Sequence, residues 1–299
     1  MRIAGIDIGS NTSLLLLAER TKEGFEVLSD QIYFTRLAEG IEQTLQFSES
    51  ALSRLDQAFS SMRKTLNQWP VDRLSIVATS AGRQAQNKNR LFELGKKHGL
   101  SPIEIVSPVR EAELTFIGAL FGLGHESSCP LVVDIGGGST ELVSLKKSYS
   151  LKMGSVSLTE KFLSPKAPSP EERLSLSQHI QSQLRGLDSF LQEDYDALIF
   201  VAGTPITLSF MEKQSSDSNE VHGLLLTENQ VHFWLEKLSG LNVEERKKIP
   251  HLPEHRADVI VAGLSLLKEL LKALGKKEFI VSAGGVRYGL VLEQSQKSF

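Results

Sequence analysis

VVDIGGGSTELV, at residues 132–143, repeats a pattern that opens the chain as AGIDIGSNTSLL, at residues 4–15. In both copies apolar residues lead into Asp-Ile-Gly, small and hydroxyl residues follow, and a second apolar run begins. This pattern is typical of a buried β-strand that ends in a glycine turn and continues into a second strand. Because it occurs twice at a domain-like spacing, we expect a duplicated architecture.

The elements predicted around each copy support the duplication. Strand, glycine turn, further strands, helix, strand and helix follow one another twice along the chain. Residues 48–69 have apolar positions at helical spacing, with Ser48 as the expected N-cap and Pro70 as the stop. In the second half, a Pro/Ser linker over 163–170 precedes a predicted helix over 171–191. The sequence therefore predicts two similar α/β domains that face each other across a cleft.

The composition narrows the class of protein. The chain has 299 residues, of which 40% are hydrophobic, and this is enough to bury a sizeable core. A net charge of −3 argues against general affinity for nucleic acid or an anionic membrane. The single cysteine, Cys129, excludes an internal disulfide and fits a reducing compartment. With no signal-like N-terminus, we expect a cytoplasmic protein that has no nucleic-acid or membrane partner.

The glycine turns predict phosphate binding. Glycine after a strand lets the backbone approach a ligand closely, and consecutive N–H groups there bind phosphate oxygens. The acids beside the turns would repel bare phosphate, but they suit Mg²⁺ (or Mn²⁺) between them and the phosphate. A single turn of this kind is also common as a plain structural feature. The candidate phosphate-binding residues are Gly9, Ser10, Asn11, Thr12, Gly136, Gly137, Gly138, Ser139 and Thr140, and the candidate metal ligands are Asp7, Asp134 and Glu141.

Ten stretches in order resemble the exopolyphosphatase / guanosine pentaphosphate phosphohydrolase (Ppx/GppA) family in its short, two-domain form. The resemblance implies an actin-like ATPase fold of two ribonuclease-H-like domains, 1–123 plus 288–299 and 124–287, around an interdomain active site. The stretches are GIDIGSNT (5–12), TRLAEGI (35–41), ATSAGRQAQN (78–87), VREAEL (109–114), VVDIGGGSTELV (132–143), MGSVSLTEKF (153–162), VAGTPITL (201–208), HGLLLT (222–227), HRADVIVAG (255–263) and VSAGGVRYG (281–289).

The resemblance also implies roles for individual residues. Glu111 matches the glutamate that activates the attacking water, and Asp134 and Glu141 match the magnesium-handling acids. Taken alone, Glu111 also fits a solvent-facing helix acid beside Arg110. The resemblance implies a catalytic role for Arg83 and phosphate binding for Arg36, Gly203, Thr204 and Arg256.

The implied activity is metal-dependent hydrolysis of the terminal phosphate of inorganic polyphosphate, with Glu111 as general base. A close alternative is hydrolysis of the 5′ phosphate of guanosine pentaphosphate. An actin-like kinase or ATPase is a different class, and the VREAEL, TRLAEG and ATSAGR segments speak against it.

A non-catalytic sensor of polyphosphate or of guanosine penta/tetraphosphate stays open, because Leu14 stands where relatives often have a basic residue or His. His222 is either a substrate contact or a turn residue. A homodimer is the expected assembly.

Overall fold

The computed structural model describes residues 1–22, 24–123 and 127–296. The chain divides into two compact units: unit 1 is Met1–Phe121 with Gly284–Phe299, and unit 2 is Gly122–Ala283. Of the domain bounds predicted from sequence, residues 124–126 and 297–299 lie outside the described residues. A cleft between the two domains stays a prediction.

Unit 1 contains a five-stranded sheet in the order β3-β2-β1-β4-β5. β1, β2 and β3 form an antiparallel meander, and β4 and β5 run parallel to β1. This is the strand order of a ribonuclease-H-like domain. The strands are β1 (Arg2–Ile8), β2 (Ser13–Arg20), β3 (Phe25–Tyr33), β4 (Arg73–Ala78) and β5 (Glu104–Ile105).

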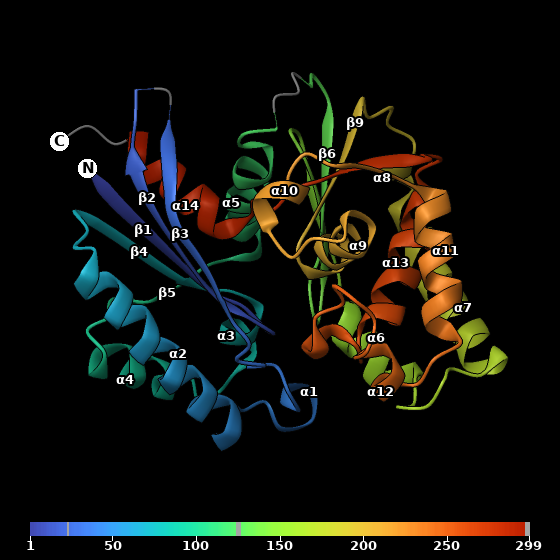
Figure 1. Cartoon of the computed structure of the whole chain (residues 1–299), viewed down its shortest axis with the longest axis horizontal. Coiled ribbons are helices and arrows are strands. Elements are labelled where there is room, and N and C mark those ends of the chain that lie inside the picture. Colours follow the sequence, from blue (N-terminus) through green and yellow to red (C-terminus); the bar gives the residue numbers. More distant parts are fainter. Residues whose placement is uncertain (23, 124–126, 297–299) are drawn as a thin grey trace. The chain divides into compact units, whose positions relative to one another are not determined.

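Helices cover both faces of this sheet (Figure 1). α2 packs its apolar stripe into one core cluster, and the side chain of Ser48 accepts a hydrogen bond from Ala51 N, so the predicted N-cap is confirmed. On the other face α5 and α14 lie very close together, since an added Cβ at Gly118 of α5 would lie 2.8 Å from Gly289 N of α14. The helices are α1 (Ile41–Thr44), α2 (Glu49–Gln68), α3 (Ser80–Gln84), α4 (Asn89–Lys97), α5 (Pro108–Leu120) and α14 (Val286–Gln296).

Unit 2 repeats this arrangement. Its sheet has the order β10-β11-β9-β6-β7-β8, which adds the antiparallel edge strand β10 to the same five-strand pattern. The predicted duplication of a ribonuclease-H-like domain is therefore confirmed. The strands are β6 (Pro130–Ile135), β7 (Thr140–Ser144), β8 (Ser148–Leu151), β9 (Ala197–Val201), β10 (Leu225–Thr227) and β11 (Glu278–Val281).

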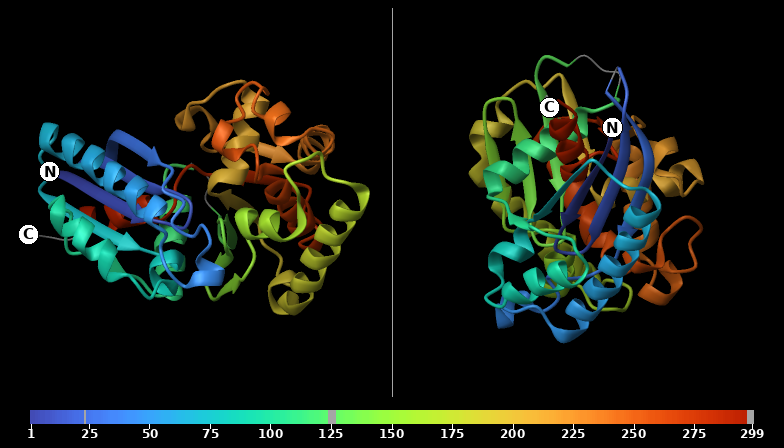
Figure 2. Two further views of the ribbon diagram at one scale, coloured as in Figure 1. Left: turned by 90° about the horizontal axis from the view of Figure 1, so that it is seen from below. Right: turned by 90° about the vertical axis from the view of Figure 1, so that its left-hand side faces the viewer.

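The main core of unit 2 lies on one face of its sheet. There α13 packs against α7 and α11 (Figure 1 and Figure 2). The helices are α6 (Ser155–Phe162), α7 (Pro170–Leu184), α8 (Asp188–Leu191), α9 (Gly203–Lys213), α10 (Ser218–Val221), α11 (Glu228–Ser239), α12 (Val243–Arg246) and α13 (Ile260–Ala273), with the 3₁₀ turns Arg185–Leu187 and Glu254–Arg256.

One helix prediction is wrong in length. The single helix predicted over 171–191 ends at Leu184, and a 3₁₀ turn and the short helix α8 follow it. Gly186 lies at the break, and glycine costs a helix interior about 1 kcal/mol relative to alanine. The buried side chain of Leu187 then joins the core of unit 2.

In the described part of the chain, no helix is long and apolar enough to span a bilayer.

Candidate functional site

Three segments of unit 1, each following a strand, begin at the same edge of its sheet. In the parallel register Ile8 pairs with Ala78, and Ala78 pairs with Ile105. The carboxyl ends of parallel strands therefore lie side by side, which is where open α/β sheets usually bind ligands. The turn after β1, helix α3 after β4 and helix α5 after β5 all begin there.

This edge brings together Arg83 and Glu111. Ser107 caps α5 by accepting a hydrogen bond from Arg110 N, which places Glu111 in the first turn of the helix. Arg83 Nη1 donates to Glu111 Oε2 at 2.6 Å and to Val106 O at 3.0 Å. Both bonds use Nη1 of Arg83, so Nη2 and Nε of its guanidinium take no part in these two bonds.

Glu111 is not a solvent-facing helix acid. Its side chain is 13% exposed. Burial raises the pKa of Glu111, while Arg83 and a hydrogen bond with Thr79 act in the opposite direction. A carboxylate with a raised pKa and a fixed orientation meets the two requirements for a general base near neutral pH.

Asp7 lies at the end of β1, on the face that α5 and α14 cover. Gly5, two residues earlier on that face, contacts α14. Asp7 Oδ1 is buried without a hydrogen-bond partner. The pKa of Asp7 is raised from 3.8 to about 7, chiefly by burial and also by the charge of Glu111, while Arg287 acts in the opposite direction. Such an oxygen suits a proton or a cation, which fits the predicted role of Asp7 as a metal ligand.

The first glycine turn directs backbone N–H groups outward. Gly9 N donates to Thr12 O, Arg36 N to Asn11 O and Ala38 N to Ser10 O, each at 2.9 Å. In a trans peptide the C=O of one residue and the N–H of the next point in opposite directions. The N–H groups of Asn11 and Thr12 therefore point away from the 36–38 segment, as an anion-binding turn requires.

The second glycine turn has the same geometry. Gly136 N donates to Ser139 O at 3.0 Å, and the carbonyls of Gly136 and Gly137 accept bonds from the first residues of α6. The N–H groups of Gly137 and Gly138 consequently point away from α6. The carbonyl bonds bring α6 so close that an added Cβ at Gly154 would lie 2.6 Å from Gly136 O.

Thr140 differs from the other predicted turn residues. Its side chain is fully buried, and its hydroxyl donates to Met153 O at 2.9 Å. Thr140 Oγ1 therefore ties the turn to the chain before α6.

Asp134 and Glu141 lie directly opposite each other on the antiparallel strands β6 and β7. Opposed residues project from the same face of a sheet. Glu141 Oε1 accepts a bond from Ser150 Oγ at 2.9 Å. Mg²⁺ is typically held by one or two carboxylates together with water and substrate phosphate, so this pair fits the ion. Over residues 1–22, 24–123 and 127–296, no group of three or more His, Cys, Asp or Glu is placed to hold a metal.

Gly203, Thr204 and Arg256 also lie together in unit 2. β9 runs parallel to β6, so the turn after β9 leaves the sheet beside the second glycine turn. The guanidinium of Arg256 lies against Gly203, where an added Cβ would be 1.6 Å from Nη2. Gly263 on α13 leaves space for Thr204 in the same way, since a Cβ added at Gly263 would lie 2.4 Å from Thr204 Oγ1.

Ala202 in this turn has a backbone conformation that is almost restricted to glycine, with φ 72° and ψ −170°. Strain of this kind costs roughly 1–3 kcal/mol and is concentrated at functional sites. The sequence gives no sign of it, because alanine is ordinary at a strand end.

No local sequence pattern identifies several residues that act on Asp7 and Glu111. Thr79 bonds to Glu111. Arg287, whose charge acts on Asp7, donates to Asp30 at 2.8 and 2.7 Å. Arg287 lies in the quoted VSAGGVRYG stretch, which was the available signal. His222 Nδ1 accepts a bond from Ala283 N at 3.2 Å, which fits the turn-residue alternative.

Two ribonuclease-H-like units in one chain define the actin-like fold class. The profile of the Ppx/GppA phosphatase family matches residues 16–298, and the chain belongs to that family. It is therefore a hydrolase of the phosphatase type.

Three relatives show how far the likeness extends. The chain is 32% identical to the bifunctional 3-dehydroquinate synthase/phosphatase of Fusobacterium nucleatum, over 97% of the chain but 46% of that protein. It is 29% identical to exopolyphosphatase 2 of Mycobacterium tuberculosis, over 97% of the chain and 98% of the relative. The crystal structure of the Ppx/GppA family member of Aquifex aeolicus has 28% identity and a TM-score of 0.84, over 100% and 99% of the chains. The chain thus spans about half the length of the first relative and nearly all of the other two.

Proposed function

We propose that the protein is an exopolyphosphatase, which hydrolyses the terminal phosphate of inorganic polyphosphate. The observation that carries the proposal is the position of Glu111. Its carboxylate is buried and bonded to Arg83, and it lies at the same edge of the sheet as the first glycine turn. The full-length likeness to a mycobacterial exopolyphosphatase supports the same substrate class.

Glu111 acts as the general base in this proposal. Its carboxylate accepts a proton from a water molecule as the water oxygen forms a bond to the terminal phosphorus. The bond from that phosphorus to the bridging oxygen breaks, and the electron pair leaves with the shortened chain. Arg83 holds the carboxylate through Nη1, and its other edge suits a phosphate oxygen.

The remaining groups stabilise negative charge. The outward N–H groups of both glycine turns, with Arg36 and Arg256, bind phosphate oxygens. Asp134 and Glu141 would hold Mg²⁺ or Mn²⁺, which when bound would neutralise phosphate charge and polarise the terminal phosphoryl group. Asp7 is a separate candidate cation ligand in unit 1.

Phosphate release from long polyphosphate in Mg²⁺ tests the proposal, with Glu111→Gln compared with the wild type. We expect a loss of about 10²–10⁴-fold in the rate. The matched control is Glu113→Gln, because Glu113 lies on the same helix with a side chain that is 56% exposed. Thermal melts show whether both variants fold.

Unchanged turnover in Glu111→Gln contradicts the mechanism. If phosphate is released from guanosine pentaphosphate but not from polyphosphate, the proposed substrate is wrong, while the proposed hydrolysis with Glu111 as base stands. Binding of either compound without release contradicts the enzymatic proposal and favours the sensor.

A further inference from the structure

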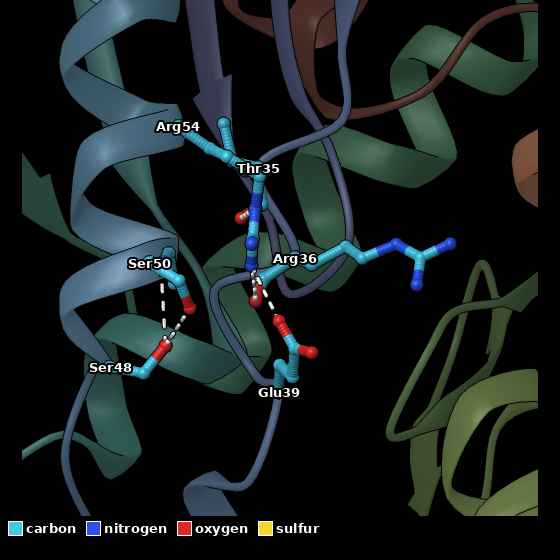
Figure 3. Close-up of polar contacts among 7 residues, drawn as sticks. Thr35, Arg36, Glu39, Ser48, Ser50 and Arg54 are labelled. Atoms are coloured by element: carbon cyan, nitrogen blue, oxygen red, sulfur yellow. Dashed lines mark hydrogen bonds and ion pairs between the residues drawn. The ribbon is translucent and has the colours of Figure 1, made fainter.

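Arg54, on α2, holds the segment that carries Arg36. Its Nε donates to Thr35 O at 2.9 Å. Its Nη2 lies 3.5 Å from Arg36 O and donates to Glu39 Oε2 at 2.6 Å. The guanidinium thus contacts three residues of one loop, and its planar fork is what allows contacts in these directions. Figure 3 shows these contacts, with the side chain of Arg36 pointing away from Arg54 and Glu39.

The same loop is bonded to the first glycine turn. Arg36 N and Ala38 N donate to the carbonyls of Asn11 and Ser10. The hydroxyls of Thr35 and Ser13 lie 3.1 Å apart and are both buried. Helix α2, the 35–39 loop and the glycine turn therefore form one continuous set of bonds.

The backbone of Arg36 needs such support. Its φ is 47°, in the left-handed region that a non-glycine residue adopts only at a cost. The carbonyls of Thr35 and Arg36 also need donors once the loop packs against the helix. Arg36 O also accepts a bond from Glu39 N at 3.1 Å, whereas Thr35 O relies on Arg54 Nε at 2.9 Å. Without Arg54, Thr35 O loses this donor and Glu39 loses its ion pair, so less holds the loop in its strained conformation.

We propose that Arg54 is a positioning residue for phosphate binding. It fixes the backbone of the 35–39 loop, and through the loop it fixes the direction of the Arg36 guanidinium and of the N–H groups of the turn. The inference rests on the proposed function, in which that turn and Arg36 bind phosphate.

Arg63 provides a matched control on the same helix. Its Nε donates to His98 O at 2.7 Å and its Nη2 donates to Gly99 O, so it also binds two consecutive carbonyls. The loop that it holds follows α4 and contains no candidate site residue. Losing either arginine removes the same kind of bond, but only Arg54 is connected to the glycine turn.

The kinetic test compares Arg54→Gln, Arg54→Lys and Arg63→Gln for phosphate release from polyphosphate in Mg²⁺. We expect Arg54→Gln to raise KM about tenfold with a smaller change in kcat, because the binding groups are misplaced rather than removed. Arg54→Lys keeps the charge but loses the fork, so it stays impaired. Arg63→Gln lowers the melting temperature to a similar degree and leaves KM within about twofold of the wild type.

A double-mutant cycle separates positioning from general destabilisation. If Arg54 acts through Arg36, then Arg54→Gln adds little to the KM of Arg36→Ala. Hydrogen exchange of the 30–45 segment without ligand gives a readout that is independent of activity, and we expect faster exchange there in Arg54→Gln alone.

Two results would overturn the inference: an equal rise in KM in Arg63→Gln, or unchanged KM and exchange in Arg54→Gln. If the wild type hydrolyses neither polyphosphate nor guanosine pentaphosphate, the proposed function fails on its own. Calorimetric binding of tripolyphosphate then decides the role of Arg54, because weaker binding in Arg54→Gln alone supports it and equal binding contradicts it.

Discussion

The two units use the same scaffold and differ in what they place beside its central strand. The turn after β1 is closed by Gly9 N to Thr12 O, and the turn after β6 by Gly136 N to Ser139 O. Opposite the strand-end aspartate, however, unit 1 has Leu14 and unit 2 has Glu141. The duplicated fold thus supplies two equivalent turns, and one side chain on the neighbouring strand separates their chemistry.

In the proposed reaction, this difference gives the two units separate roles. Unit 1 buries Asp7 near the negative charge of Glu111, an effect that Arg287 only partly offsets, and this favours a proton or a cation contact at Asp7. Unit 2 places two carboxylates at facing positions on neighbouring strands, a pair that would suit Mg²⁺. Under the proposed function, unit 1 would contribute the base and unit 2 most of the metal ligation.

The largest effect expected from the difference between the two units is on the pH dependence of stability, and it comes from Asp7. Its pKa is raised to about 7, so the folded protein keeps a proton that the unfolded chain releases near pH 4. Asp7 therefore contributes a loss of stability as pH rises from about 4 to 7, and Asp7→Asn lacks this contribution. We expect the free energy of unfolding of Asp7→Asn to gain up to about 1.4 kcal/mol per pH unit relative to the wild type in this window.

Urea unfolding at several pH values, with a chelator present, measures this difference. Asp194→Asn is the control, because that side chain is 99% exposed. A difference between Asp7→Asn and the wild type that stays constant with pH would show that Asp7 is ionised in the folded protein throughout, as an ordinary surface acid is.

A smaller effect is expected for Gly203→Ala in unit 2. The new Cβ would displace the guanidinium of Arg256, so we expect KM for polyphosphate to rise about tenfold while unit 1 is untouched. Gly186→Ala is the control, because a Cβ there meets no atom within 4 Å. If Gly203→Ala binds substrate as the wild type does, the contact between Arg256 and the turn has no part in phosphate binding.

Much of this architecture is visible in the sequence, because the residues that decide it are close together in the chain. The two Asp-Ile-Gly patterns predict the strand-turn-strand units, and Ser48 with the apolar stripe of 48–69 predicts α2. The local residues do not predict the break after Leu184, since a single glycine can also occur within a helix.

Part of the arrangement around the candidate site can be predicted from the sequence. The glycine turns and acids could be read from local patterns, and Glu111 required the family resemblance. The pairing of Asp30 with Arg287, the support of Arg36 by Arg54 and the strained backbone of Ala202 could not be read, because each depends on packing between distant segments. The position of Leu14 opposite Asp7 follows from the pairing of β1 with β2, which the sequence alone does not show.

The central claim is that both units serve one hydrolytic reaction. The most direct test measures phosphate release from polyphosphate in Mg²⁺ for Glu111→Gln in unit 1, Asp134→Asn in unit 2 and the double variant. We predict that each single variant loses roughly 10²-fold or more, and that the double variant is little worse than the slower single one, because groups that act together are not additive. Wild-type turnover in either single variant would contradict the claim.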